Sequence, residues 1–259
     1  MDVKGATELG IPVVIAPGAN TRSVAEHAMA MIFACAKNML VCDHEMRKGN
    51  FGIRSEYKAY ELYGKTLGLI GCGHIGKILA ELATGVGMKV LVYDPFLKPE
   101  TVEEWGYGYR ADMKDILKEA DAISVHTPLT PATKNMIDEP ELKLMKPTGI
   151  LVNCARGGII NEEALCKALK ENWIQAAATD VVVHERSASM TRCSSSIISS
   201  SRRIWQARRK RLHPAWQRWL PKVCWLSSAA RSGIRSATPM PISMAAGRND
   251  IFSCLAAKG

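Results

Sequence analysis

The chain has 259 residues, of which 47% are hydrophobic and 23% are charged, values normal for a globular protein with one large core or two small ones. Its net charge is +9, but residues 186–259 hold fourteen Lys and Arg against a single acid, Asp250, so residues 1–185 are net acidic. No apolar run reaches membrane-spanning length, and no secretion signal, C-x-x-C or H-E-x-x-H pattern occurs. We therefore expect a cytoplasmic protein with no membrane partner and no metal site.

Short apolar runs alternate with helix-length segments through the first 185 residues. The strands that this pattern predicts are 11–16, 66–71, 89–94, 122–126, 149–154 and 174–180. The predicted helices are 22–47, 74–87, 112–119 and 161–171. Several of the runs are apolar on successive residues, as expected for parallel strands that are covered on both faces. The sequence therefore predicts an α/β fold with a Rossmann-type doubly wound parallel sheet.

A glycine-rich segment, "IGCGHIGK", places Gly71, Gly73 and Gly76 in the pattern G-x-G-x-x-G. The first glycine ends a predicted strand and the last opens a predicted helix, the context in which this motif binds the pyrophosphate of a dinucleotide. Asp94 ends the next predicted strand. Its carboxylate can accept hydrogen bonds from an adenosine ribose and repels a 2′-phosphate, which favours NAD over NADP. The alternatives are a glycine turn without a ligand and a plain turn carboxylate.

Three charged side chains follow later predicted strands. Arg156 comes just after 149–154, where ligands of open α/β sheets bind, and its guanidinium can hold a substrate carboxylate through two bonds. Asp180 ends the next strand, and Glu185 follows it. A carboxylate beside a histidine base would orient that base. The alternatives are a surface salt bridge for Arg156 and a solvated loop acid for Glu185.

Six segments together resemble the D-2-hydroxyacid dehydrogenase family and cover residues 2 to 185 nearly without gaps. They are "DVKGATELGIPVVIAPGANTRSVAEHAMAMI", "ELYGKTLGLIGCGHIGK", "VLVYDP", "SVHTPLTPATKNMID", "LMKPTGILVNCARGGIINEEAL" and "ATDVVVHE". The resemblance is strongest to members that oxidise 3-phosphoglycerate. It implies an NAD-dependent oxidoreductase that acts on the CH–OH group of a small D-2-hydroxy acid, and a homodimer.

The resemblance also implies roles for individual residues. Arg156 would be the catalytic arginine, and Glu185 would pair with a catalytic histidine. The residues that it places at the cofactor are Gly71, Gly73, His74, Ile75, Gly76, Asp94, Thr127, Cys154, Ala155, Arg156 and Asp180. It divides the chain into a remnant of the substrate domain (1–20), an NAD-binding domain (21–185), a basic non-family tail (186–242) and a closing family helix (243–259).

The sequence departs from the family pattern at both ends. Most of the family's substrate domain precedes "DVKGATELG" and is not in this chain. Arg186 stands where the family has a proline, and no Thr-Pro-His motif follows to supply the base. We therefore expect the chain to be a dehydrogenase that is impaired or inactive as written. The alternative to a dehydrogenase is a catalytically inactive remnant whose function is to bind NAD.

The basic tail has three interpretations. The stretch "RRIWQARRKRLHPAWQRW" interleaves arginine with tryptophan, as nucleic-acid binding would require, whereas the serine-rich composition is typical of disorder. The third is a frameshift, because codons allowed for residues 207–219, read one nucleotide later, can encode Leu-Asp-Glu-Asn-Val-Cys-Thr-Pro-His-Gly-Asn-Ala-Gly. We favour the frameshift, with the frame lost near 191–195 and regained before 243, and expect no nucleic-acid partner. We also expect the sheet to lack its last strand and to leave an unpaired edge.

Overall fold

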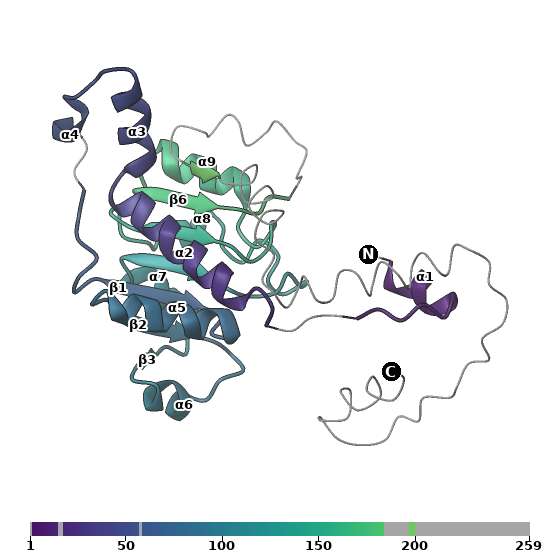
Figure 1. Ribbon diagram of the computed structural model, residues 1–259. Helices are drawn as coiled ribbons and strands as arrows, with labels where there is room; N and C mark the ends of the chain where they lie inside the picture. Colours follow the sequence, from purple (N-terminus) through teal and green to yellow (C-terminus); the bar gives the residue numbers. More distant parts are fainter. Residues whose placement is uncertain (1, 15–17, 57–58, 184–196, 200–259) are drawn as a thin grey trace, which may run out of the picture. The chain divides into compact units, whose positions relative to one another are not determined.

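The computed structural model describes residues 2–14, 18–56, 59–183 and 197–199 (Figure 1). Its strands form one sheet in the order β3-β2-β1-β4-β5-β6-β7, and all neighbouring strands are parallel. They are β1 (Thr66–Ile70), β2 (Lys89–Tyr93), β3 (Gly108–Tyr109), β4 (Ala122–Val125), β5 (Ile150–Asn153), β6 (Ala176–Thr179) and β7 (Ile197–Ser199). The order of the first six strands is that of a dinucleotide-binding fold, which confirms the predicted fold class.

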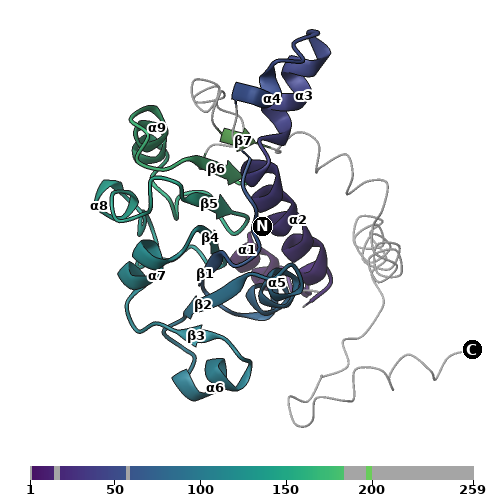
Figure 2. The ribbon, with the colours of Figure 1, turned by 90° about the vertical axis from the view of Figure 1, so that its left-hand side faces the viewer.

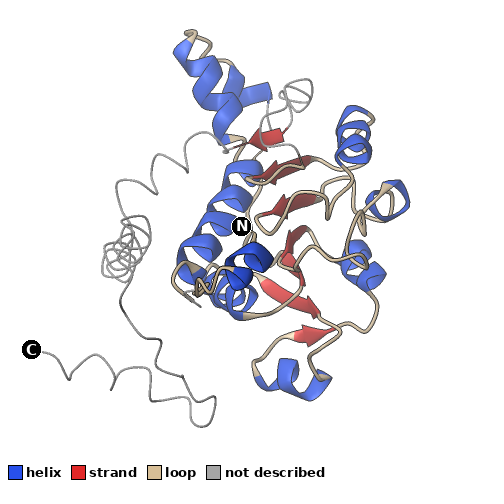
Figure 3. Ribbon diagram, turned by 90° about the vertical axis from the view of Figure 1, so that its right-hand side faces the viewer, coloured by secondary structure: helices blue, strands red, loops and turns tan. Residues whose placement is uncertain are grey.

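Helices cover both faces of this sheet. They are α1 (Val3–Glu8), α2 (Thr21–Ala36), α3 (Met39–Arg47), α4 (Ile53–Glu56), α5 (His74–Gly85), α6 (Pro99–Glu104), α7 (Met113–Glu119), α8 (Glu139–Leu142) and α9 (Glu162–Lys170). Figure 2 shows α2 and α5 on one face of the sheet and α7, α8 and α9 on the other. Figure 3 shows the strands between these two layers of helices from the opposite side.

The two faces of the sheet carry separate hydrophobic cores. In β5, Ile150 and Val152 belong to the core beneath α2 and α5, whereas Leu151 belongs to the core beneath α7 and α9. All three side chains are buried. Burial of such a side chain stabilises the fold by roughly 1.5–3 kcal/mol. The successive apolar residues of the sequence thus reflect strands that are packed on both sides.

The first predicted strand is wrong over residues 11–14, which adopt no regular secondary structure. Their apolar side chains are exposed: Ile11 to 49% and Val14 to 68%. Pro12 also lacks the N–H that a strand would donate to a neighbour. An apolar run forms a strand only where a partner strand lies beside it, and none of the described strands pairs with this one.

The long predicted helix over 22–47 is two helices, α2 and α3. The break falls at Asn38, whose φ of 50° lies in the left-handed region that asparagine tolerates better than most residues. Within the described part of the chain no single helix is long and apolar enough to cross a membrane; α2 and α3 pass such a test only together, and they bend by 62°.

The prediction of an unpaired edge at β6 is also wrong. Ile197–Ser199 form β7, in which Ile197 aligns with Ala177 and Ser199 with Thr179. Two consecutive isoleucines favour a strand, and the parallel pairing gives the edge of β6 its hydrogen-bond partners. The other residues of the predicted tail, and Glu185, lie outside the described residues.

Candidate functional site

The glycine-rich loop joins β1 to α5, and two of its glycines are required by close packing. Gly71 has a φ of 90°, and a Cβ there would lie 2.9 Å from the His126 carbonyl oxygen. A Cβ at Gly76 would lie 2.7 Å from the Gly71 carbonyl oxygen. Gly73, in contrast, has no atom within 4 Å of an added Cβ apart from those of its two neighbours in the chain. The loop is therefore compact at both ends and open at Gly73, as close approach of a pyrophosphate requires.

The start of α5 suits an anion. Gly73 is the N-cap residue, no side chain caps the helix, and the first turn contains no acid. The first N–H groups of a helix attract negative charge. His74, the first residue of α5, is exposed, whereas Ile75 is half-buried and packs against the core. The two residues thus differ in their settings: His74 is open to solvent, and Ile75 anchors the helix.

Asp94 lies directly beside this loop, just after β2. Its Oδ2 accepts a hydrogen bond from the Cys72 N–H at 2.9 Å, and its Oδ1 accepts one from the Phe96 N–H at 2.9 Å. These two bonds fix the plane of the carboxylate and connect the ends of β1 and β2. Each carboxylate oxygen can accept more than one hydrogen bond, so capacity is left for ribose hydroxyls.

The turn after β4 lies on the other side of the loop. The Thr127 Oγ1 is buried, with no hydrogen-bond partner among the described residues. A buried hydroxyl without a partner costs free energy, so its place beside Gly71 suits a bound polar group. The preceding residue, His126, lies 2.9 Å from the Ser124 hydroxyl through its Nε2, and burial lowers its pKa to about 4.

The turn after β5 carries Cys154, Ala155 and Arg156. Asn153 holds this turn from both sides, because its Oδ1 accepts from the Ala155 N–H and its Nδ2 donates to the Arg156 carbonyl, each at 3.0 Å. The Arg156 side chain is exposed and forms no ion pair among the described residues; one of its N–H groups, on Nη1, donates to the Ala155 carbonyl at 2.6 Å, which leaves the other guanidinium donors open. Its guanidinium is therefore available to a carboxylate ligand.

The loop after β6 approaches the same turn. A Cβ on Gly157 would collide with the backbone of Val182, so the two loops are in close contact. Asp180 begins this loop, and its N–H donates to the Asn153 carbonyl at 3.3 Å. The carboxyl ends of β5 and β6 thus bring Arg156 and Asp180 to one edge of the sheet, as their positions in the sequence predicted.

Asp180 also has neighbours that the sequence analysis missed. The His27 Nε2 of α2 lies 3.9 Å from Asp180 Oδ2, and the ligand atoms of His27, Cys154 and Asp180 all lie within 4.8 Å of one another. Burial, and to a lesser degree the charge of Asp180, raises the pKa of the Cys154 thiol. The one signal in the sequence was a histidine within the apolar run "VAEHAMAMI".

A parallel sheet of this order, with an open glycine turn and a carboxylate at the second strand, defines a dinucleotide-binding domain. Residues 29–214 match the family described as D-isomer specific 2-hydroxyacid dehydrogenase, NAD binding domain. The chain belongs to this family, and NAD is the cofactor of the domain.

Similar proteins agree with this assignment. A D-3-phosphoglycerate dehydrogenase of Methanocaldococcus jannaschii is 45% identical over 185 residues, which are 71% of this chain and 35% of the relative. A glyoxylate reductase of Thermococcus litoralis is 44% identical, over 71% of this chain and 57% of the relative. The crystal structure of D-lactate dehydrogenase with NAD+ from Lactobacillus jensenii has a TM-score of 0.67 at 34% identity and covers 77% of this chain and 64% of that one. The chain thus spans between a third and three fifths of these two curated relatives.

Proposed function

We propose that the chain is the NAD-binding part of a dehydrogenase that oxidises the CH–OH group of a D-2-hydroxy acid, most like 3-phosphoglycerate. The observation that carries the proposal is Arg156, an exposed guanidinium at the carboxyl edge of the sheet on a turn that Asn153 fixes. The relatives include both phosphoglycerate dehydrogenases and glyoxylate reductases, so substrate choice is the finer part of the proposal.

Each proposed residue has a physical task. The first turn of α5 would hold the pyrophosphate, Asp94 the adenosine ribose, and Thr127 a further polar group of NAD, which supplies the hydride acceptor when bound. Arg156 would hold the substrate carboxylate and polarise the reacting oxygen. Cys154, Ala155 and Asp180 would border the nicotinamide, and Glu185 would orient a histidine base.

The sequence contains no Thr-Pro-His motif after Glu185 that could supply this histidine. A general base typically contributes roughly 10²–10⁴-fold in rate. We therefore propose that this chain binds NAD and turns over little or no substrate. The experiment is a fluorescence titration with NADH, run beside turnover assays with D-3-phosphoglycerate, glycolate and D-lactate.

The expected result is saturable NADH binding with turnover at or near background. Arg156→Gln is the matched variant: it should abolish any residual turnover, because it removes a charge-assisted substrate contact. It should weaken NADH binding by no more than about threefold, because the proposed pyrophosphate and ribose contacts stay in place although Arg156 also borders the cofactor. Turnover at rates normal for the family would contradict the proposed loss of activity. Failure to bind NADH would contradict the proposed use of the site.

We also propose that the protein forms a homodimer, as the family resemblance implied, and that it is cytoplasmic, as its composition predicted. In support, α3 has no buried residue and exposes Met39 and Leu40 to more than half of their surface. Light scattering of the purified chain tests the dimer, and a monomeric mass at micromolar concentration would refute it.

A further inference from the structure

Three metal-ligating side chains from three different elements meet at the carboxyl edge of the sheet. His27 comes from the middle of α2, Cys154 from the turn after β5 and Asp180 from the loop after β6. Their ligand atoms all lie within 4.8 Å of one another. Helix α2 packs on both β5 and β6, so these positions are set by the core and not by a loose surface loop.

The three ligand types are those of a zinc site with an open position. Thiolate, imidazole and carboxylate all bind Zn²⁺, and sites with three protein ligands keep the fourth position for water or another molecule. Ligand distances of 2.0–2.3 Å place the ligand atoms of a tetrahedral site about 3.5 Å apart. Side-chain movements that shorten the distances between the ligand atoms by about 1 Å would bring the three residues to the spacing of a tetrahedral zinc site.

The surroundings favour a soft cation. The Cys154 thiol lies 3.7 Å from the Met31 thioether, which is one turn beyond His27 on α2. Cys154 is 8% exposed, whereas the side chains of His27 and Asp180 are 27% and 16% exposed, so the sulfur is the most buried of the three ligands and the imidazole the most open. Sulfur ligands select zinc and similar metals over magnesium and calcium.

We propose that His27, Cys154 and Asp180 form a binding site for Zn²⁺ or a similar thiophilic divalent cation, which competes with the nicotinamide end of NAD. On binding, the thiol of Cys154 loses its proton to solvent and its sulfur bonds to the metal. The proposed competition with NAD rests on the proposed function, which places Cys154 and Asp180 at the cofactor. The proposed binding of the metal does not depend on that function. The site would make cofactor binding sensitive to free zinc.

Cobalt replaces zinc as a visible probe in the first experiment. The full chain, reduced and free of metal, is titrated with Co²⁺, and we expect a thiolate-to-cobalt charge-transfer absorption that saturates at one equivalent. Cys154→Ala should remove this absorption, whereas Cys42→Ala, a control at another free cysteine, should keep it. His27→Ala should weaken cobalt binding by at least about tenfold, since loss of even an indirect partner costs that much. Circular dichroism establishes that the variants are folded.

The second experiment measures NADH affinity with and without Zn²⁺. Zinc should raise the apparent Kd for NADH in the parent chain and should have little effect in His27→Ala, a residue outside the proposed cofactor contacts. Absence of cobalt binding, or an unchanged absorption in both Cys154→Ala and His27→Ala, would overturn the site. An unchanged NADH affinity in saturating zinc would overturn the competition. If NADH does not bind at all, the proposed function fails, and the cobalt titration still decides the metal site.

Discussion

At the residue scale, the three glycines of the phosphate loop are required for different physical reasons. Gly71 and Gly76 are needed because a Cβ would meet backbone atoms at 2.9 Å and 2.7 Å, whereas Gly73 faces open space. The sequence pattern predicted the loop but not this division. It follows that substitutions at Gly76 and Gly73 should affect different properties of the protein.

Gly76→Ala should destabilise the fold, because the new Cβ has to displace the Gly71 carbonyl or move α5. We expect the free energy of unfolding to fall by about 1–3 kcal/mol, the usual cost of overpacking. Gly73→Ala should cost less than about 1 kcal/mol, the loss for a poorer N-cap residue, but should weaken NADH binding. Urea unfolding and NADH titration of both variants measure these effects. Equal destabilisation by the two variants would contradict the packing argument.

His126 should make stability depend on pH. Its pKa is lowered from 6.5 to about 4 in the folded protein, so the unfolded chain binds more protons between these values. The contribution of His126 to stability should therefore be constant above about pH 6.5 and fall as the pH decreases toward 4, by up to about 3 kcal/mol. Urea unfolding at pH 7.5 and pH 5 gives the slope. His126→Gln should flatten it, and an unchanged slope in that variant would exclude His126 as its source.

At the element scale, most of the sheet follows from local sequence, because strands that are buried on both faces need apolar residues throughout. The predictions for β1, β2, β4, β5 and β6 agree with the structure to within two residues at each end. The predictions failed for segments whose conformation depends on a partner strand far away in the sequence. Residues 11–14 have no partner among the described strands and form no strand, whereas residues 197–199 pair with β6 and form β7. The contact between His27 and Asp180 joins positions far apart in the chain, so spacing could not show it.

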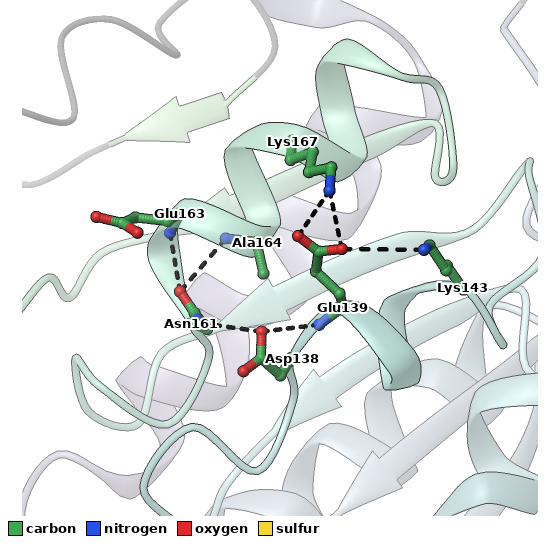
Figure 4. A network of polar contacts seen from close by, with 7 residues as sticks. All are labelled: Asp138, Glu139, Lys143, Asn161, Glu163, Ala164 and Lys167. Carbon is green, nitrogen blue, oxygen red and sulfur yellow. Dashed lines mark hydrogen bonds and ion pairs between the residues drawn. The ribbon is translucent and has the colours of Figure 1, made fainter.

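Polar side chains join α8 to α9, and they offer a test of which kind of contact holds two helices together (Figure 4). The Asn161 Oδ1 accepts from the N–H groups of Glu163 and Ala164, capping α9, and its Nδ2 donates to Asp138 Oδ1 at 2.9 Å. Asp138 in turn caps α8. The Lys167 Nζ reaches both oxygens of Glu139 at 2.9 and 3.0 Å, but this ion pair is exposed.

Asn161→Ala should lower the free energy of unfolding by about 2 kcal/mol, because it removes a helix cap and leaves Asp138 with one partner fewer. Glu139→Gln should change it little, because an exposed ion pair is weakened by solvent screening and by the entropy of its side chains. Urea unfolding of the two variants makes the comparison. A larger loss in Glu139→Gln would show that the ion pair, and not the cap, joins the helices.

At the scale of the whole molecule, the proposed cofactor contacts all lie between Gly71 and Asp180, whereas no Thr-Pro-His motif follows Glu185 in the sequence. Strands β1 to β6, the glycine loop and Arg156 are all in place. The proposed base would come from a segment after Glu185, where the family match continues to residue 214. We propose that the basic tail reflects a shifted reading frame, and β7 shows that part of this tail nevertheless pairs with the sheet.

Resequencing the source DNA across codons 186 to 245 tests this directly. We expect a one-nucleotide correction near codons 191–195 that restores Thr-Pro-His about 30 residues after Glu185, and a second that restores the frame before codon 243. The corrected chain should gain the roughly 10²–10⁴-fold in turnover that a general base contributes. NADH affinity should change little, because the proposed cofactor contacts all precede Glu185. An unchanged DNA sequence would make the basic tail a genuine part of the protein. The proposed NAD site would then serve cofactor binding without hydroxy-acid oxidation.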